Sequence, residues 1–466
     1  MKQFAKKSLV LFIALFFTAA LSAKTPKYIF YCIGDGMSFA HVMATQLFYE
    51  NGNYEDGNES LVFLDFPVRS AIRTYANNSL ITCSAAAGTA LATGHKTNLA
   101  HIGIGPDKQP LTSVAKQLRD KGYAIGIITS GQLDDATPAA FYAGQMRNDT
   151  YQIGKEDSQF DFLAGSTLMK PFNRRDPSQP YIYDYYRQKG YTVCRGPEGY
   201  NSQKNADKIL LVDTDTTLKK WLPYVIEREP GKLGLEFMVQ AGIEKLYKKK
   251  NKKGFFMMIE GASIDHASHP RDIATTIKET IEFDRSVRLA YEFYKKHPDE
   301  TLIIVTADHE TGGLTIGETT THPFNWEYVN YQKMSKESLS KLFQKMRETG
   351  EIDTWEKTKK ILAENTGLWD KIPVNAGEEA QLMQCYYETI VKKSSKQEIT
   401  LYAKSEPLVA DAIALLNKKI GVGWTSFSHT GGFVPFYAIG CQARQFGALN
   451  DNIEIPNTIR KIMKIK

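Results

Sequence analysis

The sequence predicts an α/β fold built on a large, mostly parallel central sheet with helices on both faces. Short apolar, β-rich segments alternate along the chain with helical stretches, which is the order that parallel βαβ units produce. The apolar runs are nearly continuous, as expected of strands covered on both faces. The 466 residues are 42% hydrophobic and 24% charged, a composition that supplies a large core.

Residues 1–23 have the pattern of a secretory signal peptide. A lysine-bearing start precedes an apolar run from Ser8 to about Ala20, and small residues continue to Ala23. The run is too short to span a membrane, so we expect cleavage near Ala23 and a periplasmic or secreted protein without a membrane anchor. Cleavage removes three lysines and with them half of the net charge of +6. The remaining net charge is too weak to indicate a nucleic-acid-binding surface.

The strands of the predicted sheet follow in order. They are expected at residues 27–34, 123–130, 255–261 and 301–308, with helices over 111–122 and 274–297 between them. Residues 321–419 contain polar amphipathic helices and no strands, which predicts a helical insertion shaped like a cap. The strand over 433–441 completes the sheet. The catalytic core therefore consists of residues 24–320 and 420–466, separated by the insertion.

Polar side chains recur where the predicted strands end. Ligands of open α/β sheets bind beyond the carboxyl ends of the strands. Alone, each of these residues is typical of a turn, a helix cap or a buried hydrogen-bonded histidine. Together they favour metal binding, because buried charge without a partner is costly. In chain order they are Asp35, Asp135, Thr137, Glu260, Asp265, His269, Asp308 and His309, and His429 precedes the last strand.

The donor types predict two zinc sites and one magnesium site. A zinc site with room for substrate takes three nitrogen or oxygen ligands, and two such sets are Asp265 with His269 and His429, and Asp35 with Asp308 and His309. Hard oxygen donors favour magnesium, and that set is Asp35, Thr137 and Glu260.

Ser84 and Arg147 indicate the substrate. Ser84 lies in a Gly/Ala-rich stretch that opens a helix, where backbone N–H groups favour an anion. A metal activates a serine hydroxyl, and two metals stabilise the attacking and leaving oxygens of an in-line displacement. The planar guanidinium of Arg147 suits the oxygens of a phosphate group. The substrate that this set describes is a phosphate ester.

Six sequence blocks carry these residues: "YCIGDGMS", "ITCSAAAGTALATGHKT", "DDATPAAFYAG", "MMIEGASIDHASH", "TADHETGG" and "SHTGGFVPFYAIG". They resemble the successive signature blocks of the alkaline phosphatases, over residues 28–440 apart from the insertion. The resemblance implies a phosphomonoesterase with an alkaline optimum, in which Ser84 forms a phosphoserine intermediate. It implies the same three metal sets, with the zinc at His269 on the leaving-group oxygen and the zinc at His309 activating Ser84. Arg147 would bind phosphate oxygens, and homodimers are common in the family.

Three features in or next to these blocks depart from the family pattern or vary within it: Cys83, the segment "AGQMR" that ends at Arg147, and His266. "AGQMR" lacks the usual histidine and is one residue shorter than the common pattern, so the register of Arg147 stays open at this point. Cys83 stands before Ser84, where relatives commonly have an acid that orients the arginine, so the resemblance implies a looser Arg147; Cys83 as a rival nucleophile is an alternative. His266 beside Asp265, with Asp135, can approach the third metal, where zinc is then an alternative to magnesium.

Two other functions stay open at this point. A phosphodiesterase or sulfatase of the same superfamily is one, although "CSAAAG" lacks the arginine of a sulfatase motif. A non-catalytic phosphate- or metal-binding export protein is the other.

Overall fold

The computed structural model describes residues 24–54, 56–155, 159–214, 221–249, 252–317, 324–393, 398–402 and 404–465. The predicted signal peptide, residues 1–23, lies outside the described residues. Within the described ranges, no helix combines the length and the apolar character needed to cross a membrane.

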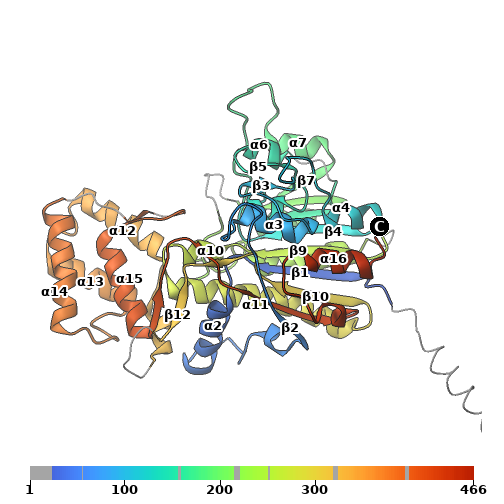
Figure 1. The fold of residues 1–466 in the computed structure, drawn as a ribbon. Coiled ribbons are helices and arrows are strands. Elements are labelled where there is room, and N and C mark those ends of the chain that lie inside the picture. Colours follow the sequence, from blue (N-terminus) through green and yellow to red (C-terminus); the bar gives the residue numbers. More distant parts are fainter. Residues whose placement is uncertain are drawn as a thin grey trace, which may run out of the picture.

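The centre of the molecule is a nine-stranded sheet (Figure 1). Its strands, in spatial order, are β2 (Val68–Ile72), β17 (Val434–Gly440), β10 (Thr301–Thr306), β1 (Tyr28–Gly34), β9 (Phe255–Gly261), β4 (Ala124–Thr129), β6 (Phe162–Ala164), β8 (Lys208–Val212) and β7 (Tyr191–Arg195). β17 runs antiparallel to both of its neighbours, β2 and β10, and the other eight strands of this sheet run in one direction. The mostly parallel sheet predicted from the apolar runs is therefore confirmed.

Four of the nine strands were not predicted. They are β2, β6, β7 and β8, which lie toward the two edges of the sheet. β6 has three residues, and β2 and β7 mix buried with more exposed positions. These three lack the continuous apolar run by which the central strands were found, whereas β8 was missed although Ile209–Val212 form such a run. The sheet is consequently wider than the sequence pattern indicates.

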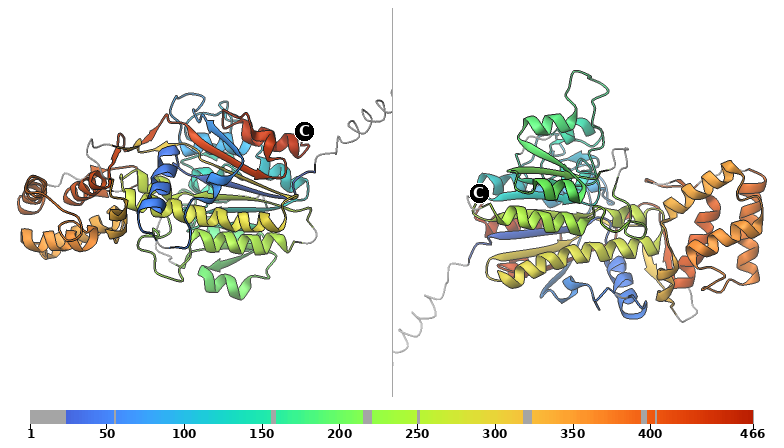
Figure 2. Two further views of the ribbon diagram at one scale, coloured as in Figure 1. Left: turned by 90° about the horizontal axis from the view of Figure 1, so that it is seen from below. Right: turned by 180° about the vertical axis from the view of Figure 1, so that it is seen from behind.

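Helices cover both faces of the sheet. On one face lie α9 (Leu235–Tyr247) and the long α11 (Ile273–Lys296), seen from behind in Figure 2. On the other lie α3 (Ser84–Thr93), α4 (Val114–Asp120), α5 (Ala136–Ala139) and α16 (Glu454–Ile462). The remaining core helices are α2 (Phe39–Asn51), α6 (Thr150–Gly154), α7 (Ile182–Gln188), α8 (Gly196–Gln203) and α10 (Ser263–Ser268).

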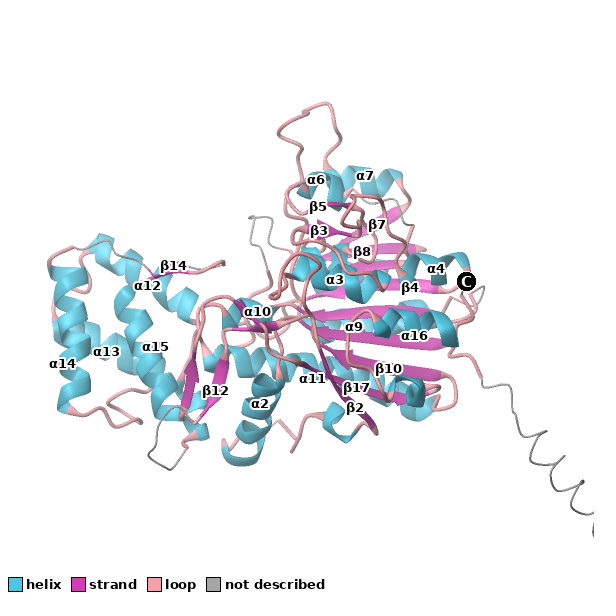
Figure 3. Ribbon diagram, in the orientation of Figure 1, coloured by secondary structure: helices cyan, strands magenta, loops and turns pink. Residues whose placement is uncertain are grey.

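A helical lobe stands beside the sheet (Figure 3). We use this name for α12 (Lys336–Thr349), α13 (Trp355–Thr366), α14 (Ala376–Tyr386) and α15 (Pro407–Ile420), with the short hairpin of β13 (Glu398–Ile399) and β14 (Lys404–Ser405). β12 (Leu314–Ile316) leads into the lobe and pairs with β15 (Val422–Trp424), which leads out of it. Because the two connections are hydrogen-bonded to each other, the lobe begins and ends at one point of the core.

We expect the buried carboxyl of Glu279, in α11, to make stability depend on pH. Burial and the neighbouring Glu282 raise the pKa of Glu279 to about 8. An unfolded glutamate has a pKa of about 4.3, so between these values the folded state holds a proton that the unfolded state has lost. The free energy of unfolding then falls as pH rises, by up to ~1.4 kcal/mol per pH unit.

Urea unfolding of the wild type and of Glu279→Gln between pH 5 and pH 8 measures this effect. The glutamine keeps an acceptor for the Val225 N–H, which lies 2.6 Å from the glutamate oxygen, and it removes the titration. We expect the variant to gain stability relative to the wild type as pH rises. Glu292→Gln, an exposed residue of the same helix, is the control. Parallel pH profiles for the wild type and Glu279→Gln would contradict the expectation.

Candidate active site

The carboxyl ends of three adjacent strands bring acidic side chains together. β1 lies between β10 and β9, and the parallel register places Ile33 level with Thr306 and Glu260. Asp35 and Asp308 follow within two residues of these positions, and all three acids are buried. Gly36 N–H donates to Asp308 Oδ1 at 3.1 Å, which ties the loop after β1 to the loop after β10. The strand register itself therefore assembles the cluster.

Gly36 has to be a glycine for this loop to close. Its φ is 75°, in the left-handed region. A Cβ at this position would lie 2.9 Å from Thr311 Oγ1 and 3.0 Å from the Cα of Asp265. The missing side chain lets the loop after β1 approach two segments that carry site residues.

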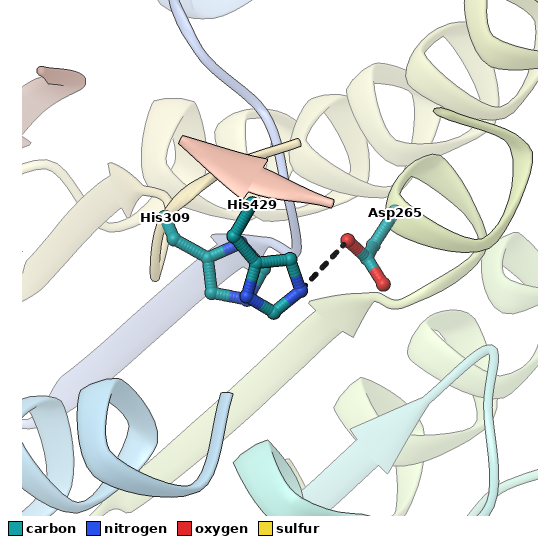
Figure 4. A group of neighbouring side chains, drawn as sticks. All are labelled: Asp265, His309 and His429. Carbon is teal, nitrogen blue, oxygen red and sulfur yellow. Dashed lines mark ion pairs between the residues drawn. The ribbon is translucent and has the colours of Figure 1, made fainter. Parts of the chain in front are cut away.

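Two groups of side chains have the geometry to hold a metal ion. Asp265, His309 and His429 form one, and Asp35, Asp308 and His309 form the other, each with donor atoms within 4.8 Å of one another. Figure 4 shows the first: Asp265 approaches from α10, while the rings of His309 and His429 overlap, with centroids 3.6 Å apart. His309 belongs to both groups and so links the two sites.

The histidines are oriented by backbone carbonyls. His269 Nδ1 lies 2.6 Å from the carbonyl oxygen of Phe427, and His429 Nδ1 lies 3.1 Å from that of Thr82. If Nδ1 carries the proton, each ring presents a bare Nε2 to the site. The two Nε2 atoms lie 3.4 Å and 3.7 Å from the oxygens of Asp265. This is how proteins commonly orient histidines that bind metals.

The structure thus brings together the predicted first zinc set, Asp265, His269 and His429, and places His309 beside it. Among the described residues, Nε2 of His269, Nε2 of His429, Oδ2 of Asp265 and Oδ1 of Asp35 are buried without a hydrogen-bond partner. Unpartnered buried polar atoms are rare in folded proteins. Nitrogen and carboxylate donors left free in this way fit zinc.

Burial and mutual repulsion shift the pKa values of the acids. Burial, with Asp308 and other carboxylates nearby, raises the pKa of Asp35 well above its usual range. The pKa of Glu260 is also raised well above its usual range by burial, and that of Asp308 to about 7. Asp265 is the exception: although burial opposes ionisation, His269, His429 and His309 hold the pKa of Asp265 well below its usual range. A cluster of this kind is relieved by cations.

Oxygen donors surround the position predicted for magnesium. Thr137 Oγ1 donates to Asp308 Oδ2 at 3.4 Å, and Thr137 also lowers the pKa of Glu260 against the effect of burial. The Thr129 hydroxyl donates to Glu260. The structure therefore brings Thr137, Glu260 and Asp308 together, and the donor set contains hard oxygens that fit magnesium.

Ser84 is the first residue of α3 and is buried. Its Oγ lies 3.1 Å from His309 Nε2, the residue shared by both metal-binding groups. Gly88, one turn further along, brings α3 close to α5, since a Cβ there would lie 3.0 Å from the Cα of Thr137. The helix N-terminus and the metal-binding groups thus face the same point, where an anionic group would be favoured.

Arg147 is linked to Asp135 and, through Ala100, to the residue before Ser84. Its backbone N–H donates to Ala100 O at 2.9 Å, and its Nη2 lies 3.0 Å from Asp135 Oδ1. The Cys83 sulfur accepts from the N–H of the same Ala100 at 3.4 Å. The thiol at position 83 was expected to loosen Arg147; in the structure, Asp135 provides the carboxylate that orients it.

His266 lies next to Asp135 and Arg147. All three line a cavity of about 170 Å³. Burial lowers the pKa of His266 to about 4, and its Nδ1 is one of the unpartnered atoms among the described residues. The ring packs against two aromatic side chains, Trp221 at 4.6 Å and Tyr402 at 4.4 Å between centroids.

Four residues of the site were not predicted from the sequence. Thr311 donates to Asp265 and lies 3.3 Å from His309 Nδ1, and Thr129 holds Glu260. Thr311 lies inside the block "TADHETGG" and was within reach of sequence reasoning. Trp221 and Tyr402 carry no local signal, because each lies in a loop far along the chain from the residues it contacts.

Comparisons with known proteins agree with this geometry. A family model described as alkaline phosphatase matches residues 26–161 and 203–465. Alkaline phosphatase 4 of Bacillus subtilis (strain 168) is 30% identical over 93% of this chain and 87% of its own length, and alkaline phosphatase 3 of the same organism is 27% identical over 100% and 98%. The crystal structure of a cold-active alkaline phosphatase from a psychrophilic Shewanella species has a TM-score of 0.75 at 26% identity, covering 94% of this chain and 99% of that one. The chain therefore belongs to the alkaline phosphatase family.

Proposed function

We propose that the protein is an exported phosphomonoesterase that hydrolyses phosphate monoesters through a phosphoserine intermediate. The observation that carries the proposal is the position of the Ser84 hydroxyl, buried at the start of α3 and 3.1 Å from His309. A buried hydroxyl facing two metal-binding groups and an arginine is suited to attack on a phosphorus atom.

We assign two zinc ions and one magnesium ion to the donor sets of the site. The residues that would hold them are Asp265, His269 and His429 for one zinc; Asp35, Asp308 and His309 for the other; and Asp35, Thr137 and Glu260 for magnesium. When bound, such cations stabilise the charge on the attacking and leaving oxygens of an in-line displacement.

The protein residues would act in two displacement steps. In the first, Ser84 Oγ attacks phosphorus and gives up its proton to the surrounding water, the Oγ–P bond forms, and the bond from phosphorus to the ester oxygen breaks; that oxygen takes up a proton from water and leaves as the alcohol. In the second, a water oxygen attacks phosphorus, the bond to Ser84 breaks, and a proton of that water returns to Ser84 Oγ as inorganic phosphate is released. Arg147 would hold two phosphate oxygens with its planar fork, and Asp135 would keep that fork in place.

Ser84→Ala should abolish turnover of p-nitrophenyl phosphate, because the alanine cannot form the bond to phosphorus. We expect a loss of kcat on the order of 10³-fold or more, with zinc content unchanged by elemental analysis. Ser202→Ala, an exposed serine of α8, should retain full activity. Full activity of Ser84→Ala would refute the phosphoserine mechanism, and activity lost only together with zinc would show that the change disrupted the metal-binding groups.

Chelation should remove activity reversibly. Treatment with a chelator leaves the acids and histidines of the site without cations, and we expect hydrolysis to stop and to return when zinc and magnesium are added together.

Assays from pH 6 to pH 11 should show an alkaline optimum, because high pH favours the ionised serine nucleophile. Faster hydrolysis of bis-p-nitrophenyl phosphate than of the monoester would favour a phosphodiesterase. Phosphate binding without turnover would favour a non-catalytic binding protein.

Export rests on the leader at residues 1–23, with its lysine-bearing start and apolar run. Expression in a bacterial host with a periplasm should yield a mature chain that begins near Lys24, measured by N-terminal mass spectrometry of the periplasmic fraction. A variant with Leu11 and Leu15 changed to arginine should stay in the cytoplasm uncleaved. Cytoplasmic retention of the full-length wild type would contradict export.

A further inference from the structure

The hairpin of the helical lobe places an aromatic residue inside the site. Tyr402 follows β13 and precedes β14, and β14 lies on the side of the lobe that faces the sheet (Figure 3). Its ring centroid lies 4.4 Å from that of His266 and 5.1 Å from that of His269. A residue of the lobe therefore contacts two histidines that follow the central acid Asp265 in the chain.

Trp221 adds a second aromatic surface from a different part of the chain. Its ring centroid is 4.6 Å from that of His266 and 5.8 Å from that of Tyr402, and the two aromatic planes meet at 84°. Edge-to-face pairs of this kind hold each other in fixed orientations. Tyr402 and Trp221 thus form a rigid corner, which we call the aromatic corner.

The aromatic corner lines the same cavity as the arginine of the site. The cavity, of about 170 Å³, is bounded by Arg147, Asp135, His266, Trp221 and Tyr402 among others. Arg147 pairs with Asp135 at 3.0 Å, and the Tyr402 side chain lines the same cavity and, after Asp135, helps to raise the pKa of the guanidinium. Arg147 is therefore flanked by a carboxylate from the core and by a tyrosine from the lobe.

We propose that Tyr402 is a positioning and specificity residue of the phosphatase site. Its hydroxyl orients Arg147 toward the phosphate oxygens, and its ring with Trp221 forms the wall against which a flat, aromatic leaving group packs. The inference rests on the proposed phosphomonoesterase function and adds to it a substrate class, aryl phosphate monoesters. His269, assigned to the metal at the leaving-group oxygen, lies against Tyr402, so the wall stands where the leaving group departs.

Two substitutions separate the two roles of Tyr402. Tyr402→Phe removes only the hydroxyl and keeps the wall, whereas Tyr402→Ala removes both. Inorganic phosphate as a competitive inhibitor reports on Arg147, because it has no leaving group. The ratio of kcat/KM for 1-naphthyl phosphate to that for glycerol 2-phosphate reports on the wall, since only the first substrate carries an aromatic ring.

We expect Tyr402→Phe to weaken phosphate inhibition about tenfold, the scale for losing a hydrogen bond to a charged group, and to leave the aryl-to-alkyl ratio unchanged. Tyr402→Ala and Trp221→Ala should each lower that ratio about tenfold. Tyr387→Phe and Tyr387→Ala are matched controls, because Tyr387 belongs to the same lobe and is 47% exposed. Both controls should match the wild type in every measurement.

Inhibition and ratios within twofold of the wild type in active, folded Tyr402 variants would overturn the proposal. If Tyr402→Ala fails to fold, Tyr402→Phe and Trp221→Ala still test the two roles separately. Uniform loss of kcat on all substrates, without a change in phosphate inhibition or in the ratio, would show that Tyr402 only packs the lobe against the core and would also overturn it. A wild type that hydrolyses no phosphate monoester would refute the function itself, an outcome visible before any variant is made.

Discussion

The burial of several carboxylates at one edge of a parallel sheet is the constraint on which the rest of the site depends. Asp35, Glu260 and Asp308 end three neighbouring strands, and no arginine or lysine stands among the described partners of these three side chains. Burial and repulsion from neighbouring carboxylates raise the pKa of all three, so the cluster is unfavourable as it stands. Cations relieve this repulsion, and the surrounding structure is arranged to admit them.

The histidines show how the fold prepares that arrangement. Backbone carbonyls of Phe427 and Thr82 hold Nδ1 of His269 and His429, which leaves each Nε2 facing Asp265. The pairing of β11 (Glu310–Thr311) with β16 (His429–Thr430) sets His429 opposite Thr311, and so beside His309. Main-chain contacts thus hold site residues from distant segments in place.

Arg147 is paired with a different residue from the one that the family pattern indicates. A thiol precedes Ser84 where an acid was expected, yet Arg147 is paired with Asp135, which lies on a different loop. A carboxylate acceptor fixes the plane of a guanidinium, and here Asp135 supplies it. Tyr402 of the helical lobe lines the same cavity as Arg147 and Asp135, so the lobe and the core share one cavity wall.

Much of the fold was predictable from local pattern. The central strands β1, β4, β9 and β10 were predicted from continuous apolar runs, because a strand buried on both faces has no polar side to interrupt the run. β2, β6 and β7 were missed because they are short or interrupt the apolar run with more exposed positions, whereas β8 was missed although Ile209–Val212 are apolar and buried.

By itself the sequence determined the kinds of donor atoms and the order in which they follow the strands, since both are properties of residue type and spacing. Only the tertiary structure decided that His309 belongs to both metal-binding groups, that Asp135 holds Arg147, and that Trp221 and Tyr402 meet over His266. The physical reason is that these contacts join loops far apart in the chain. These contacts depend on strand register and on the packing of the lobe against the core, and neither can be predicted from local composition.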